Sequence, residues 1–153
     1  MNLKILVVED DPIWRTCISD YLEREPDMKD TYEAANKEEA LQLCREINPD
    51  VVLMDIHLSE GLMEGIDAVS EIKLFMETKI IMITSFNEKD LIINSLAAGA
   101  VNYVAKTDYR RLPSVIRAAM CEITPVHTVM SDYMRLKKDE LLAPLTQAEK
   151  EVF

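Results

Sequence analysis

The sequence predicts an α/β fold, in which a doubly wound, five-stranded parallel sheet is covered by helices on both faces. Five short apolar runs of strand length alternate with stretches in which apolar residues recur at helical spacing. The most apolar run, VVLMDIHL (51–58), is typical of a parallel strand that is buried on both faces. Strands that alternate with helices in this way form parallel sheets.

The first half of the chain contains three strand candidates and two helices. The strands are 4–8, 31–35 and 51–55. Asp11 is a good N-cap and Pro12 a good first helical residue, so a helix is predicted directly after the first strand. Asn36 and Glu39 have capping-box spacing at the start of the second helix, and the Asn-Pro pair at 48–49 ends it.

The second half continues the alternation. The remaining strands are 79–84 and 102–106, and the helices are 66–76, a helix capped by Asn87 that ends near Gly99, and a last helix that contains residues 115–123. The first domain is therefore predicted to span residues 1–123. Residues 124–145 are predicted to be a linker that is helical in part, and Thr146 and Glu149 have capping-box spacing at the start of another helix.

Composition limits the class of protein. The 153 residues suffice for one domain with a proper core and a tail, and no run of 18 apolar residues is present. The formal charge of −11 argues against DNA binding by this chain alone, because phosphate contacts need a basic surface. The first apolar run is too short for a signal peptide, so a cytoplasmic location is expected. Cys17, Cys44 and Cys121 are expected to be buried free thiols.

Polar residues lie where four of the predicted strands end. Right-handed crossovers bring the carboxyl ends of all the strands to one edge of the sheet, where such sheets bind ligands. Glu9, Asp10, Asp55, Thr84 and Lys106 are therefore expected at that edge. Carboxylates that lie close together take up protons unless a cation intervenes. Hard oxygen ligands favour Mg²⁺, and we expect this metal and the lysine to stabilise Asp55.

At this point the sequence resembles the receiver domain of two-component response regulators. The matching segments are VVEDD (7–11), PDVVLMDIHL (49–58), IMITS (81–85) and GAVNYVAK (99–106). They occur in the order of that family, and the resemblance covers about residues 3–123. It implies the strand order 2-1-3-4-5.

The resemblance also implies the roles of individual residues. Asp55 corresponds to the aspartate that accepts a phosphoryl group from a sensor histidine kinase. Glu9 and Asp10, with Asp55 and the main-chain carbonyl of His57, correspond to the Mg²⁺ ligands. Lys106 corresponds to the lysine that pairs with a phosphoryl oxygen.

Two further residues have roles in the predicted switch, and two are expected to affect the lifetime of the phosphoryl group. Thr84 corresponds to the hydroxyl that moves to the phosphoryl group, and Tyr103 to the aromatic side chain that swings inward with it. A half-buried strand aromatic is the simpler interpretation of Tyr103. His57 and Phe86 lie two residues beyond Asp55 and Thr84, where we hypothesise that they tune the lifetime of the acyl phosphate.

The end of the chain indicates the class of regulator. LTQAEKEVF (145–153) resembles the start of the helix-turn-helix output domain of NarL/LuxR-class regulators. Thr107 follows Lys106 where the family often has proline, which also fits that class. The chain is then expected to be the input half of a transcription factor, which forms a homodimer on phosphorylation, contacts DNA only through the missing output domain and does not contact membranes.

Other functions share parts of this pattern. A stand-alone phosphorelay carrier has the same site. A phosphatase that forms an aspartyl phosphate usually carries a second acid two residues after its nucleophile, and His57 occupies that place. A flavin-binding protein of the flavodoxin type needs a phosphate-binding loop after the first strand, where EDDP (9–12) would repel phosphate.

Overall fold

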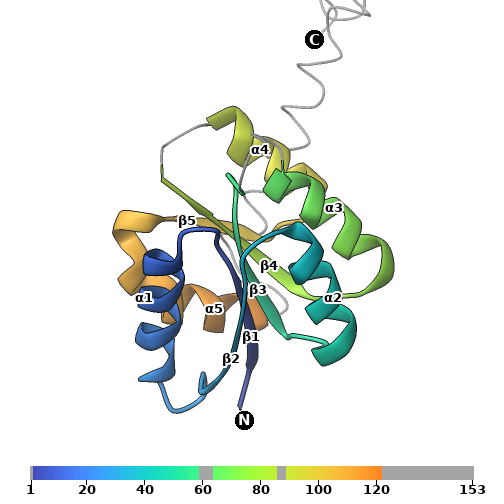
Figure 1. Cartoon of the computed structure of the whole chain (residues 1–153). Helices are drawn as coiled ribbons and strands as arrows, with labels where there is room; N and C mark the ends of the chain where they lie inside the picture. The colour runs from blue at the N-terminus through green and yellow to red at the C-terminus, as the bar shows by residue number, and fades with distance from the viewer. Residues whose placement is uncertain (1, 59–63, 86–88, 122–153) are drawn as a thin grey trace, which may run out of the picture.

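Five strands alternate with five α-helices in the computed structural model, which describes residues 2–58, 64–85 and 89–121 (Figure 1). The elements are β1 (Lys4–Val8), α1 (Pro12–Glu23), β2 (Asp30–Ala34), α2 (Lys37–Ile47), β3 (Val51–Asp55), α3 (Glu64–Phe75), β4 (Lys79–Thr84), α4 (Lys89–Ala98), β5 (Asn102–Ala105), the 3₁₀ helix η1 (Lys106–Arg111) and α5 (Leu112–Met120).

The strands form one parallel sheet in the order β2-β1-β3-β4-β5. This confirms both the predicted fold class and the predicted strand order. All the strands run in the same direction, so the residues that follow β1, β3, β4 and β5 meet at the carboxyl edge of the sheet.

Two apolar layers cover the sheet. Alternate residues of a strand point to opposite faces. Ile5 and Val7 pack with residues of α1 and α5, such as Ile18 and Ile116, in one buried cluster. Leu6 and Val8 belong to the other cluster, which includes residues of α2, α3 and α4. Figure 1 shows the same arrangement, with α1 and α5 on one side of the sheet and the other three helices on the opposite side.

The predicted helix starts are confirmed in α1 and α2. The side chain of Asp11 accepts a hydrogen bond from the main-chain N–H of Ile13 at 2.9 Å, with Pro12 in the first helical turn. The side chain of Asn36 accepts one from the N–H of Glu39, also at 2.9 Å. These bonds satisfy N–H groups that have no partner within the helix.

The structure differs from the prediction mainly after β5. The sequence predicts that residue 106 belongs to the strand, but this residue begins η1, a 3₁₀ segment that is kinked at Asp108 and leads into α5. The predicted N-cap Asn87, the linker 124–145 and the helix that starts at 146 lie outside the described residues.

The expectation that all three cysteines are buried is wrong. All three are free thiols, but Cys121 is exposed because it lies just past the end of α5, and Cys17 on α1 is half-buried. Only Cys44 is buried, against β1 and α3, and burial raises the pKa of its thiol to about 11.

Within the described ranges, no helix has the length and apolar character needed to cross a bilayer.

Candidate functional site

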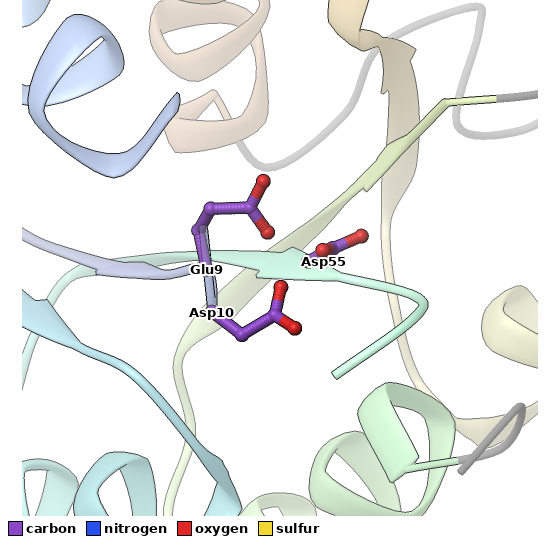
Figure 2. Close-up of side chains that lie close together, drawn as sticks. All are labelled: Glu9, Asp10 and Asp55. Carbon is purple, nitrogen blue, oxygen red and sulfur yellow. The ribbon is translucent and has the colours of Figure 1, made fainter. Parts of the chain in front are cut away.

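Three carboxylates meet at the carboxyl edge of the sheet. Glu9 and Asp10 directly follow β1, and Asp55 is the last residue of β3. One carboxylate oxygen from each residue lies within 4.8 Å of the others. Figure 2 shows the three side chains extending toward one another from these two neighbouring strands. The predicted cluster of acids is therefore present.

The main chain at Glu9 is held from two sides. Its N–H donates to the carbonyl of Ala34 at 3.1 Å, which extends the pairing of β1 with β2. Its carbonyl accepts a hydrogen bond from Nη1 of Arg15 at 2.9 Å, and Nε of the same guanidinium lies 3.1 Å from Oε1 of Glu33. The side chain of Glu9 is only 1% exposed, so a carboxylate is fixed in a nearly dry position.

Lys106 places an ammonium group among these acids. It follows β5 directly and is buried. Its Nζ donates a hydrogen bond to Oε1 of Glu9 and lies 3.5 Å from Oδ2 of Asp55. The lysine was expected at Asp55, but Glu9 is its closer partner. One ammonium beside three carboxylates leaves an excess of negative charge when all of them are ionised.

This crowding changes the protonation of the site. The pKa of Glu9 is raised to about 8: burial is the largest cause, the neighbouring carboxylate of Asp55 adds to it, and Lys106 opposes both effects. Burial acts to lower the pKa of Lys106, but the hydrogen bond to Glu9 and the charge of Asp55 outweigh it, so the net shift is upward. Burial and crowding therefore favour the protonated form of Glu9, as expected for crowded carboxylates.

The three acids fit a hard divalent cation. Oε2 of Glu9 is buried, and no hydrogen-bond partner for it is present among the described residues. A buried oxygen without a partner is costly, and a cation would satisfy it. The donors are all carboxylate oxygens, with no sulfur, so the set suits Mg²⁺ better than zinc.

Asp55 is fixed by a tight turn and by a glycine. Its Oδ1 accepts a hydrogen bond from the main-chain N–H of His57 at 3.2 Å. Gly65, at the start of α3, donates its N–H to the carbonyl of Ile56 at 3.2 Å. A Cβ at position 65 would lie 2.1 Å from the carbonyl oxygen of Asp55. Only glycine allows α3 to approach Asp55 this closely. The spacing of residues in the sequence does not reveal this role of Gly65.

A comparison with protein families identifies the family to which this fold belongs. The family model described as the response regulator receiver domain matches residues 5–117. The chain belongs to this family.

Similar proteins include a response regulator and a methylesterase. The response regulator protein VraR of Staphylococcus aureus is 31% identical, over 99% of this chain and 74% of VraR. A protein-glutamate methylesterase/protein-glutamine glutaminase of Carboxydothermus hydrogenoformans is 36% identical, over 70% of this chain. The receiver chain spans only about 30% of that methylesterase.

Solved structures show the same fold. A LuxR-family two-component response regulator from Aurantimonas has a TM-score of 0.74 at 29% identity, over 89% of this chain and 99% of that one. The response regulator domain of Thermotoga maritima CheB has a TM-score of 0.73 at 29% identity, over 82% of this chain and all of that one.

The structure also describes three of the four other predicted site residues, Thr84, Tyr103 and His57. Thr84 ends β4 and is buried, and it pairs in register with Ala105, the residue before Lys106. Tyr103 on β5 is half-buried against the apolar cluster that includes α3 and α4 residues. His57 follows Asp55 by two residues and is half-buried. Phe86 lies outside the described residues.

Proposed function

We propose that this receiver domain accepts a phosphoryl group on Asp55 from the phosphohistidine of a sensor histidine kinase. The observation that carries the proposal is the convergence of Glu9, Asp10 and Asp55, with Lys106 facing Asp55 at 3.5 Å. An Asp55 oxygen would attack phosphorus, the P–N bond to the histidine would break, and an acyl phosphate would form. Its carboxylate is held by the N–H of His57 and by the lysine, so it is already oriented.

Mg²⁺ would be held by Glu9, Asp10, Asp55 and the main-chain carbonyl of His57. When bound, the metal neutralises charge on the phosphoryl oxygens. Glu9 would give up its proton, because metal ligands must be deprotonated. Lys106 would then leave Glu9 and pair with a phosphoryl oxygen.

The phosphorylated state would be read through Thr84 and Tyr103. Thr84 is buried at the end of β4 and pairs in register with Ala105 of β5. Its hydroxyl is therefore near the carboxyl edge of the sheet, where the phosphoryl group would arrive. Tyr103 on β5 pairs in register with Met82, which lies two residues before Thr84 on β4. A new charge at Asp55 would bias these two side chains and the surface of α4, β5 and α5.

The output is proposed to be transcription regulation by a LuxR-class protein. The match to VraR extends over 99% of this chain, whereas the match to the methylesterase covers 70% of it. We propose that the chain works in the cytoplasm and forms a homodimer on phosphorylation. DNA binding would need an output domain, whose start we propose at residues 146–153. A stand-alone phosphorelay carrier is the alternative within signalling.

His57 and Phe86 are proposed to tune the lifetime of the acyl phosphate by shielding it from water. His57 is half-buried two residues from Asp55. His57→Ala and Phe86→Ala are expected to change the dephosphorylation rate. Equal rates in wild type and both variants would exclude this role.

Intact mass after incubation with acetyl phosphate tests the central proposal. Wild type should gain one phosphoryl group with Mg²⁺ and none with a chelator, and Asp55→Asn should gain none. Asp50→Asn is a matched control, because Asp50 precedes β3 at the opposite edge of the sheet and its carboxylate accepts from the N–H of Lys4. Phosphorylation of Asp55→Asn at the wild-type level would overturn the proposal.

A further inference from the structure

The ammonium of Lys106 contacts an aromatic ring as well as the acids. Nζ lies over the ring of Trp14, 5.7 Å from its centroid. This distance is within the range of cation–π attraction, in which the negative face of the indole attracts the positive charge. Trp14 is in the first turn of α1, four residues after Asp10. The same short segment therefore provides two metal-ligand candidates and a ring that contacts the lysine.

Trp14, Glu9 and Asp55 all lie close to the ammonium of Lys106. The two acids lie at the sheet edge and attract the ammonium by charge, whereas the indole belongs to α1. Lys106 has only 11% of its side chain exposed, so few water molecules compete with these contacts. A lysine side chain has four rotatable carbon–carbon bonds, and a fixed ring beside its end restricts where the charge can lie.

Trp14 is itself held by a row of aromatic rings. The ring of Tyr109 meets it edge to face, with centroids 6.2 Å apart and planes at 75°. Tyr109 meets Tyr21 of α1 in the same way, at 5.2 Å and 78°. The hydroxyl of Tyr21 donates to the carbonyl of Arg110 at 3.3 Å. These contacts join α1 to η1, the segment that begins at Lys106, so the ring and the lysine main chain are held together.

We propose that Trp14 is a positioning residue for Lys106 in phosphoryl transfer. The indole face holds the ammonium near Asp55 while the lysine exchanges Glu9 for a phosphoryl oxygen. An apolar side chain of similar bulk would fill the space but would not attract the charge. This inference rests on the proposed role of Lys106 at Asp55.

A double-mutant cycle separates positioning from packing. Trp14→Leu should slow phosphorylation by acetyl phosphate about three- to tenfold at saturating Mg²⁺, and Trp14→Phe, which retains a π face, should recover most of the rate. In a Lys106→Ala background, Trp14→Leu should have no further effect, because coupled residues are not additive. Tyr109→Phe, which keeps the ring against Trp14, is the matched control and should retain the wild-type rate.

A spectroscopic measurement tests the contact without phosphorylation. Trp14 is the single tryptophan of the chain, so its fluorescence reports on this site alone. Lys106→Met should change the emission of Trp14, whereas Lys37→Met, which removes an ion pair with Glu71 on the other face of the sheet, should not. If Lys106→Met changes the Trp14 emission but the wild-type chain accepts no phosphoryl group, the proposed function is contradicted. The contact between Lys106 and Trp14 is then still supported. Equal losses of rate from Trp14→Leu in both lysine backgrounds, or an emission unchanged by Lys106→Met, would overturn the inference.

Discussion

Lys106 and Glu9 form a buried hydrogen-bonded pair although they are 97 positions apart in the sequence. The pair joins the end of β5 to the end of β1, across the strands β3 and β4 that lie between them. The ammonium of Lys106 contacts Oε1 of Glu9. The other carboxylate oxygen, Oε2, is buried and has no hydrogen-bond partner among the described residues. Binding of a cation by Glu9 would therefore rearrange this pair.

The proton on Glu9 predicts the pH dependence of stability. Its pKa in the folded state is about 8, above the ordinary value of 4.5, so the folded state binds the proton more tightly than the unfolded state. The stabilisation is full below pH 4.5 and is lost as the pH rises to about 8. The unfolding free energy of the metal-free domain should fall by up to about 1.4 kcal/mol per pH unit across this window. Urea unfolding with chelator checks this, and Glu9→Gln should flatten the slope.

The same proton predicts the pH dependence of metal affinity. Mg²⁺ must displace one proton from Glu9 below about pH 8. The apparent Mg²⁺ affinity should therefore rise by up to about tenfold per pH unit toward pH 8 and then level off. Titration calorimetry at several pH values measures it. An affinity that is independent of pH between 6 and about 8 would show that Glu9 does not exchange a proton for the metal.

Lys106→Met should have opposite effects on metal binding and on phosphorylation. The substitution removes a cation that competes with Mg²⁺ for Glu9 and Asp55, so the Mg²⁺ affinity should increase several-fold. Phosphorylation by acetyl phosphate should nevertheless slow, because a charge that would stabilise the transferred group is lost. Weaker Mg²⁺ binding in Lys106→Met would contradict the proposed competition.

Gly65→Ala should damage both stability and the site. The new Cβ would meet the carbonyl oxygens of Asp55 at 2.1 Å and Ile56 at 2.7 Å, and main-chain atoms cannot rotate away as a side chain can. We expect a loss of about 1–3 kcal/mol in the free energy of unfolding and a slower phosphorylation of Asp55. Glu64→Ala, one residue earlier on α3, is the control. Wild-type stability and rate in Gly65→Ala would mean that α3 does not fix the phosphoacceptor.

Asp11→Ala should lower stability without affecting metal binding. Asp11 caps α1 through the N–H of Ile13, and loss of an N-cap costs about 1 kcal/mol. Asp11→Asn should retain nearly all of the stability, because asparagine caps equally well. Thermal unfolding of the three proteins measures the difference. A loss of stability in Asp11→Asn equal to that in Asp11→Ala would show that charge, and not the cap, is important at this position.

Much of the fold and the core of the site followed from the sequence because they depend on regular patterns. Apolar runs located the five strands, and the handedness of the crossovers brought Glu9, Asp10 and Asp55 to one edge. The sequence did not predict the segment η1 after β5, because this segment depends on tertiary packing of Tyr109 against α1. The role of Gly65 depends on a close approach between α3 and the main chain of Asp55, which residue spacing does not reveal.

The most direct test of the account is calorimetric titration of Mg²⁺ at a pH above 8, where Glu9 is ionised. Asp10→Asn and Asp11→Asn each remove one carboxylate, at adjacent positions, but only Asp10 belongs to the cluster of acids. Wild type and Asp11→Asn should bind one ion with equal affinity, and Asp10→Asn should bind it at least about tenfold more weakly. Equal Mg²⁺ affinity in all three proteins would contradict the metal site on which the proposed phosphorylation of Asp55 depends.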